Sequence, residues 1–267
     1  MNIFPDILKL IRNRSLIFRM GYKDITDRYA GSAFGLLWTI MQPLLLISIY
    51  ALVFTFIFRV RVDNNGGPII YAFYAIAGLL PWIAIADGLG KSVGIVTSKG
   101  ALVKQAIFPV EILPISTALT SLLPLLSGLL IYLIAMLIFA PTHFSWFLLL
   151  LPVVILLHFI FICGIGYLLS IVGTYFRDLI EIVSFLITVG MFITPILYLE
   201  SSIPKAFVLP MKLNIFAHLI YMYRDCIFYG QIRHPWSFVI FGLCAIIVFF
   251  LGIISFKKVK HLFANVL

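Results

Sequence analysis

Long apolar runs alternate with short charged segments along the whole chain. Six of the runs contain at least 20 residues. A helix needs ~20 mainly apolar residues to cross ~30 Å of hydrocarbon, so runs of this length predict membrane-spanning helices rather than the ~10-residue strands of a membrane barrel. The predicted spans are Phe34–Phe58, Ile69–Val96, Ile112–Ala140, Trp146–Tyr175, Leu179–Leu199 and Ser237–Phe256.

The first 33 residues have a different pattern. Their apolar and basic residues fall on opposite faces of a helix, with Ile7, Leu8, Ile11 and Phe18 against Lys9, Arg12, Asn13 and Arg19. Lys23–Asp27 and Asp24–Arg28 are opposite charges four residues apart, which favours a helix. The pattern predicts an amphipathic helix at the membrane interface. A plain positively charged tail is the alternative.

About 35 residues separate the fifth and sixth predicted spans. This region mixes prolines, aromatic residues and scattered charges, and its subsegment Ile215–Tyr229 is apolar but too short to cross a bilayer. We expect one or two re-entrant or interfacial helices here on the outer side. Non-helical backbone at that depth is tolerated only against protein or a water-filled path. A folded external loop is the alternative.

The lysines and arginines predict the orientation. Thirteen of them lie on the side that holds the N-terminus and six lie on the other. Cytoplasmic loops carry the excess of basic residues, so we expect both termini in the cytoplasm. The expected organisation is a single transmembrane domain over 1–267. It comprises an interface helix (1–33), spans one to five (34–199), an outer re-entrant segment (200–235), the sixth span (236–257) and a cytoplasmic tail (258–267).

Composition agrees with a lipid environment. The chain is 63% hydrophobic and 11% charged, whereas soluble domains are about 45–50% apolar and about 25% charged. The net charge of +9 could indicate nucleic-acid binding in a soluble protein. Here the basic residues lie between apolar runs, so we assign them to membrane orientation and expect no nucleic-acid partner.

Residues that could carry chemistry are scarce. The stretch GLGKSVG at Gly88–Gly94 lacks the first glycine of a phosphate-binding loop, because position 85 is isoleucine. Asp87 and Lys91 are better explained as an ion pair across one helical turn. The histidines and cysteines follow no metal-binding or catalytic spacing, so no metal site and no catalytic residues are expected. Few ionisable residues fall inside the spans, which disfavours a transporter driven by protons or sodium.

Aromatic residues are dense in the first span, where they include Phe34, Trp38, Tyr50, Phe54 and Phe58. Aromatic faces can stack on sugar rings, which would suit a passage for a glycan. Interfacial tryptophan and tyrosine also anchor ordinary helices in lipid, and this alternative stays open.

Several motifs together resemble the membrane subunit of ABC exporters for lipid-linked polysaccharides, the family that exports O-antigen, capsule and teichoic acid. The motifs follow the family's order along nearly the whole chain. They are DITDRYAGSAFGLLWTIMQPLLLISIYALVFTFIF (Asp24–Phe58), AGLLPWIAIADGL (Ala77–Leu89), LVKQAIFPVEILP (Leu102–Pro114), YFRDL (Tyr175–Leu179), ITPILY (Ile193–Tyr198) and HLIYMYRDCIFYG (His218–Gly230).

The resemblance implies a homodimeric permease in the bacterial inner membrane. Each dimer would bind two copies of a separate cytoplasmic ATPase, which would hold the ATP and Mg²⁺, so no cofactor is expected in this chain. The expected substrate is a glycan on a polyprenyl diphosphate, moved from the inner to the outer leaflet. The expected fold has six spans, an N-terminal interface helix and outer re-entrant helices.

The resemblance also implies that Lys99–Pro114 is a cytoplasmic coupling helix that docks into the ATPase. Phe108 would be its aromatic anchor and Pro109 would help to end the helix. Lys104 and Glu111 would make polar contacts. Lys99 and Gln105 belong to the same segment, while Arg177 and Asp178 form a second cytoplasmic corner. A solvated loop between two spans is the alternative.

The remaining expected sites lie along the substrate's route. Lys23 and Arg28 are candidates for receiving the lipid diphosphate at the cytoplasmic face. The five aromatic residues of the first span would line the passage. Tyr198, Tyr223, Arg224 and Asp225 would form an outer gate. In this hypothesis, closure of the ATPase dimer pushes the coupling and interface helices and separates the first and fifth spans across the permease dimer.

Other functions stay open from the sequence. The chain could export teichoic acid, or a small hydrophobic compound through the same fold. It could also be an ion-coupled transporter or a membrane enzyme that acts alone. The family often has Asn-Pro where this chain has Asn214-Ile215, so we expect a different start of the outer helix there.

Overall fold

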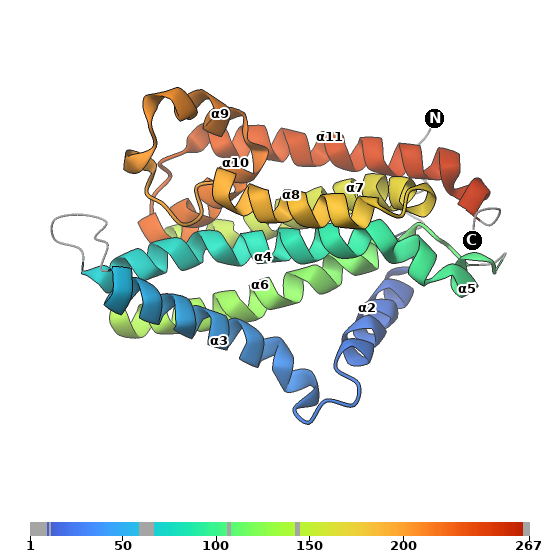
Figure 1. Ribbon diagram of the computed structural model, residues 1–267, viewed down its shortest axis with the longest axis horizontal. Helices are drawn as coiled ribbons and strands as arrows, with labels where there is room; N and C mark the ends of the chain where they lie inside the picture. The colour runs from blue at the N-terminus through green and yellow to red at the C-terminus, as the bar shows by residue number, and fades with distance from the viewer. Residues whose placement is uncertain (1–9, 11, 59–66, 106–107, 142–144, 264–267) are drawn as a thin grey trace.

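All regular elements in the described residues are helical, which confirms the all-α class. The computed structural model describes residue 10 and residues 12–58, 67–105, 108–141 and 145–263. The α-helices are α2 (Arg14–Arg28), α3 (Trp38–Leu52), α4 (Pro68–Ser98), α5 (Gly100–Val103), α6 (Ile112–Phe139), α7 (Leu151–Tyr175), α8 (Leu179–Ile193), α9 (Val208–Leu213), α10 (Ile215–Arg224) and α11 (Pro235–Val259) (Figure 1). Short 3-10 segments cover Gly35–Leu37, Trp146–Leu150, Glu200–Ser202, Lys205–Phe207 and Lys260–Leu262, and π-helical segments cover Val53–Phe58 and Asp225–Tyr229.

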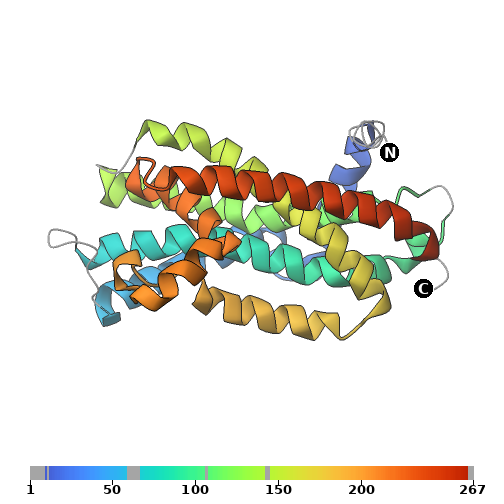
Figure 2. The same ribbon diagram turned by 90° about the horizontal axis from the view of Figure 1, so that it is seen from above.

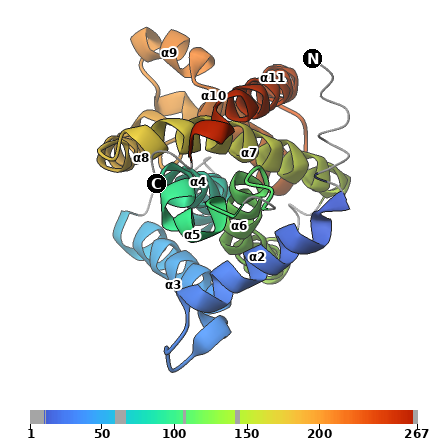
Figure 3. The ribbon, with the colours of Figure 1, turned by 90° about the vertical axis from the view of Figure 1, so that its right-hand side faces the viewer.

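Helix α4 is the centre of the bundle. Seen from the end that carries α5, α4 and α6 lie in the middle, with α2 and α3 on one side and α7, α8 and α11 on the other (Figure 3). In its most apolar window 78% of the residues are buried, against 17–39% in the other four long apolar helices. A helix that is apolar all round is buried by its neighbours, so these neighbours take the lipid-facing positions around α4.

Five helices in the described residues are long and apolar enough to cross a membrane: Gly35–Ile57, Pro68–Ser98, Ile112–Phe139, Trp146–Tyr175 and Pro235–Leu262. They confirm five of the six predicted spans. A sixth candidate is the pair Lys205–Leu213 and Ile215–Tyr229, which bends by 91°. This geometry is that of a broken span or a re-entrant loop, as the sequence predicts between the last two spans.

The fifth predicted span is shorter than expected. Helix α8 has 15 residues, about 22 Å at 1.5 Å per residue, and lies at the edge of the bundle (Figure 2). It ends at Ile193 because Thr194 precedes Pro195, and a residue directly before proline disfavours the helical conformation. Thr194 is accordingly extended, with φ −81° and ψ 140°.

Helix α2 confirms the N-terminal helix over Arg14–Arg28; Ile7, Leu8, Lys9 and Ile11 lie outside the described residues. It packs on α6 through buried Ile17 and Gly21. The expected pair Asp24–Arg28 is not formed within the helix. Asp24 instead pairs with Lys99, and Arg28 pairs with Asp87 of α4. The predicted Asp87–Lys91 pair is confirmed.

Glycines let the helices approach at backbone distance. A Cβ on Gly164 of α7 would lie 2.5 Å from the Phe249 nitrogen of α11, and one on Gly173 would lie 2.1 Å from the Val93 carbonyl oxygen of α4. Small residues drive such packing in membranes, where lipid supplies no hydrophobic force between helices. These contacts hold α7 tightly between α4 and α11.

Gly173→Ala is expected to lower the stability of the protein by at least about 2 kcal/mol, because the new methyl group overlaps a backbone oxygen that cannot rotate away. Thermal unfolding of the detergent-solubilised protein measures the effect. Gly90→Ala is the matched control, since an added Cβ there meets nothing within 4 Å. Equal unfolding midpoints for the two variants would contradict the close approach of α7 and α4.

Candidate functional site

The segment between α4 and α6 is a short exposed projection at one end of the bundle, which we call the α5 end (Figure 1). Its helical part is only the turn Gly100–Val103, and Lys104 and Gln105 after it are exposed. Phe108 is half-buried and packs against the core. Pro109 does not end the helix, which has already stopped at Val103. Its carbonyl accepts from the Ile112 N–H at 3.1 Å, in the turn that starts α6.

Both ends of this segment are held by ion pairs. Lys99 Nζ lies 2.6 Å from Asp24 Oδ1 of α2. At the other end the Glu111 carboxylate pairs with Lys260, just beyond α11, and the Tyr167 hydroxyl donates to the Glu111 carbonyl at 2.7 Å. Glu111 is buried. Its carboxylate is therefore used within this chain and is not presented to a partner, unlike the role expected from the sequence.

Arg177 and Asp178 lie at the same end, in the corner between α7 and α8 (Figure 3). Both side chains are exposed. The backbone carbonyl of Asp178 accepts from the Glu181 N–H at 3.1 Å and starts α8. The corner is thus fixed through its backbone, which leaves both charged side chains available to another molecule.

A cavity of about 340 Å³ opens beside this segment, between α2, α4 and α6. Arg28, Lys91 and Lys99 line it, together with Asp24. Arg28 NH2 lies 3.0 Å from Asp87 Oδ1, and Lys91 pairs with the other oxygen of the same carboxylate. Three cations therefore share two carboxylates. The excess positive charge beside a cavity would favour an anionic group.

Lys23 is placed differently from Arg28. Its side chain is exposed and it is not among the residues that line the cavity. The structure therefore brings Arg28, but not Lys23, to the position where an anionic headgroup could enter.

The aromatic residues of the first span fall into two groups. Phe34 and Trp38 contact each other edge to face at 5.9 Å between ring centroids, and Phe34 is exposed. Tyr50 stacks on Phe54 at 5.7 Å, and Phe54 is buried against Tyr71. Phe54 thus packs inside this subunit rather than along an open surface. The side chain of Phe58 lies outside the described residues.

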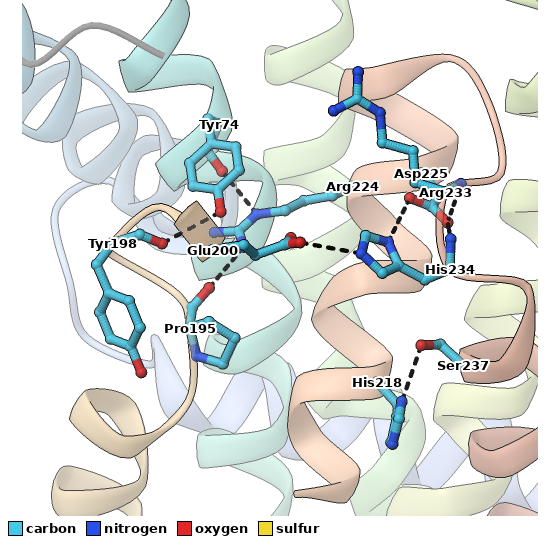
Figure 4. A network of polar contacts seen from close by, with 10 residues as sticks. All are labelled: Tyr74, Pro195, Tyr198, Glu200, His218, Arg224, Asp225, Arg233, His234 and Ser237. Atoms are coloured by element: carbon cyan, nitrogen blue, oxygen red, sulfur yellow. Dashed lines mark hydrogen bonds and ion pairs between the residues drawn. The ribbon is translucent and has the colours of Figure 1, made fainter. Parts of the chain in front are cut away.

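At the opposite end, the α9 end, side chains satisfy the backbone where α8 breaks. Arg224 donates to the carbonyls of Pro195 and Ile196, each at 2.7 Å, and to that of Tyr74 at 3.3 Å (Figure 4). Its guanidinium also lies 3.6 Å from the centroid of the Tyr74 ring. Three tyrosine hydroxyls donate to backbone carbonyls of the same region: Tyr198 to Ile193, Tyr71 to Leu197 and Tyr74 to Tyr198.

This arrangement explains how irregular backbone is tolerated in the buried region after α8. Each of the carbonyls from Ile193 to Tyr198, apart from that of Thr194, accepts from a side chain. Non-helical backbone at membrane depth requires such partners because lipid offers none. Arg224 is completely buried, so its charge is used inside the protein.

Asp225 holds the turn before α11. Its carboxylate accepts from the backbone N–H groups of Arg233 and His234 at 3.0 and 2.8 Å, and Oδ1 lies 3.0 Å from His234 Nδ1. His234 Nε2 lies 3.1 Å from Glu200 Oε2 (Figure 4). Burial alone would lower the pKa of His234, but its hydrogen bonds to Asp225 and Glu200 outweigh burial and raise the pKa to about 9.

The His234 interaction predicts a pH-dependent stability. Because folding raises this pKa from 6.5 to about 9, the stabilisation is complete below pH 6.5 and is lost as pH rises through 9. The difference amounts to about 3 kcal/mol. We expect the thermal unfolding midpoint to decrease as pH is raised from 6.5 to 9. This decrease should be smaller in His234→Gln. His261→Gln, at an exposed histidine, should keep the wild-type profile; a full pH dependence in His234→Gln would contradict the assignment.

Of the four residues expected at the outer gate, three meet in this network. Tyr198 and Arg224 both make hydrogen bonds in the irregular backbone after α8. Asp225 accepts from the backbone of the turn before α11. Tyr223 points elsewhere, with its hydroxyl 3.1 Å from His158 Nδ1 of α7. Asn214 is the N-cap of α10, and its side-chain oxygen accepts from the Phe216 N–H at 3.0 Å.

Sequence reasoning missed Glu200 and His234, it gave no role to Lys260 or Tyr74, and it paired Asp24 with Arg28 instead of Lys99. Their partners lie between 9 and 150 residues away along the chain. No periodicity or motif reports contacts at such separations. A signal was present only for Tyr71 and Tyr74, which stand out as hydroxyl-bearing aromatics inside an apolar span.

Comparisons with known proteins show a family and several relatives that the chain is similar to along nearly its whole length. The profile described as "ABC-2 type transporter" matches residues 15–228. The chain is 32% identical over 263 residues to an O-antigen export system permease protein, RfbA, of Myxococcus xanthus, with 97% of this chain and 98% of that protein covered. It is 28% identical to RfbA of Klebsiella pneumoniae (98% and 95% covered) and 25% identical to the polysialic acid transport protein KpsM of Escherichia coli (88% and 90% covered).

Proposed function

This chain belongs to the ABC-2 type transporter family, and from this premise we propose that it is the transmembrane subunit of an ATP-driven polysaccharide exporter. Members of the family are multi-pass permeases of the bacterial inner membrane, and the ATPase is a separate subunit. The observation that carries the proposal is the similarity to O-antigen export permeases over 97–98% of the chain. The similarity includes both the α5 end and the re-entrant segment.

The α5 end is the proposed docking surface for the ATPase. Lys104, Gln105, Arg177 and Asp178 are exposed there, and Phe108 offers a half-buried aromatic ring. Aromatic residues that fill a partner's pocket commonly dominate an interface. Lys99, Pro109 and Glu111 fix the shape of the segment instead of contacting the partner. The excess of basic residues at this end supports a cytoplasmic location, with both termini inside the cell.

The substrate we propose is a glycan carried on a polyprenyl diphosphate. The cavity beside Arg28, Lys91 and Lys99 supports it, because the excess cationic charge suits a phosphate-bearing headgroup that enters from the inner leaflet. The carrier lipid would remain in the bilayer while the sugar chain crosses. ATP and Mg²⁺ would bind to the partner ATPase and not to this chain.

The permease would act as a homodimer. Helices α3 and α8 both carry exposed large apolar side chains, including Ile40, Leu44, Phe185 and Phe192. Pairing of these faces from two copies would place Phe34, Trp38 and Tyr50 along a passage between the subunits. Phe54 would support Tyr50 from within one subunit.

Reconstitution into vesicles tests this function. The purified chain is combined with its ATPase, and transfer of a lipid-linked glycan to the opposite leaflet is measured with and without ATP. We expect transfer only with both ATPase and ATP. Transfer by the chain alone would support an independently acting transporter and contradict the proposal. Transfer of a small hydrophobic compound but no glycan would assign the chain to the other substrate class.

A further inference from the structure

The segment between α4 and α6, from Lys99 to Glu111, is tied at each end to a different part of its own subunit. Lys99 pairs with Asp24 of α2, and Glu111 pairs with Lys260 just after α11. Resting on the proposed function, we infer that the ion pairs Lys99–Asp24 and Glu111–Lys260 are positioning contacts. They transmit movement of the docked segment to α2 on one side and to α11 on the other.

The first contact joins the start of the segment to α2. Lys99 directly follows α4 and precedes α5, so any displacement of α5 displaces its backbone. The Lys99 and Asp24 side chains are only 25% and 20% exposed, and their charged atoms are 2.6 Å apart. A charge-assisted hydrogen bond with restricted access to water is stronger than an exposed surface pair. Movement of α5 therefore reaches α2.

The second contact joins the end of the segment to α11. The Glu111 side chain is 10% exposed and pairs with Lys260, while its backbone carbonyl is held by the buried hydroxyl of Tyr167 in α7. Glu111 immediately precedes α6. Force on the segment thus reaches α6, α7 and α11 through one residue.

Between these two contacts, the segment presents side chains that are exposed. Lys104 and Gln105 are exposed and available to a partner. Lys99 and Glu111 adjoin α4 and α6 in the chain, and their ion pairs add α2 and Lys260 after α11 to the groups that a displacement of the segment reaches. The two ion pairs therefore connect movement of this segment to α2 and α11.

Charge reversal in the assembled complex tests the inference. In Asp24→Lys and in Lys260→Glu, we expect binding of the ATPase to stay near wild type. Glycan transferred per ATP hydrolysed should fall at least about tenfold, the scale of losing one hydrogen bond to a charged group. The double exchange Asp24→Lys with Lys99→Asp should restore most of this ratio. Asp27→Lys and Lys258→Glu, at exposed positions of the same two helices, are the matched controls and should transfer normally.

A cross-link separates a positioning role from a merely stabilising one. In a variant without the native cysteines, cysteines placed at Asp24 and Lys99 are joined by a short bismaleimide. If the two residues move together, the cross-linked complex keeps its transfer per ATP. If cross-linking abolishes transfer while single labelling does not, the contact must open during the cycle and the inference is wrong.

The outcomes also separate this inference from the proposed function. A wild-type chain that neither binds an ATPase nor transfers glycan with it would overturn the proposed function. A wild-type complex that works, together with reversal variants that keep a normal transfer per ATP, would overturn only the inference. If a single reversal fails to assemble, the double exchange and the cross-link decide.

Discussion

Arg224→Ala is expected to destabilise the protein by about 3–5 kcal/mol, because each buried polar group left without a partner costs about 1–3 kcal/mol. Arg224 is completely buried and donates to the carbonyls of Tyr74, Pro195 and Ile196. Alanine leaves two of these carbonyls without their donor on the irregular backbone after α8, where Arg224 and Ile196 are buried away from water. The thermal unfolding midpoint and the yield of folded protein measure the loss.

Two further variants make this test specific. Arg233→Ala removes an arginine that is exposed and lies over the Tyr229 ring, and we expect a loss below about 1 kcal/mol. Arg224→Lys keeps the charge but cannot reproduce the forked geometry, so an intermediate loss is expected. If Arg224→Ala unfolds at the wild-type temperature, the broken end of α8 is not held in the way described.

Phe108→Ala is expected to abolish the stimulation of ATP hydrolysis by substrate in the assembled complex. An aromatic anchor at an interface contributes about 2 kcal/mol or more, which corresponds to roughly a 30-fold loss of affinity for the partner. Binding of the ATPase and its hydrolysis rate with and without glycan are measured on the same preparation.

Part of the Phe108 side chain packs on its own subunit, so a matched variant is needed. Val110→Ala removes a partly buried side chain from the same segment and should cost some stability without loss of stimulation. Full stimulation in Phe108→Ala, or equal losses in the two variants, would show that Phe108 is not the anchor.

Much of the fold follows from the pattern of apolar residues. Five spans, the N-terminal helix and the bent helix pair are all visible as runs or as composition, because the membrane requires long helical apolar segments. The Asp87–Lys91 pair was also predictable, since both partners lie on one helix. The end of α8 was less visible. Its apolar run continues to Leu199, and only Pro195 marks the break.

The candidate site was predictable in location but not in its contacts. The sequence places the segment between α4 and α6 and the residues Tyr223, Arg224 and Asp225 toward opposite ends of the bundle, and α5 and α10 do lie toward opposite ends (Figure 1). It did not reveal that Arg28 pairs with Asp87 or that Glu111 pairs with Lys260. Helical spacing reports neighbours on the same helix, whereas these partners meet only after the helices pack.

The central claim is that force reaches this permease through the segment between α4 and α6, seated in a cytoplasmic ATPase. The most direct measurement is photo-cross-linking from Gln105 in intact cells, with Gln231 at the opposite end as the control position. We predict a photo-adduct between position 105 and the ATPase. When cysteine is placed at each position instead, an impermeant thiol reagent added outside the cell should label position 231 but not position 105. Labelling of position 105 from outside the cell, with no adduct to the ATPase, would contradict the account.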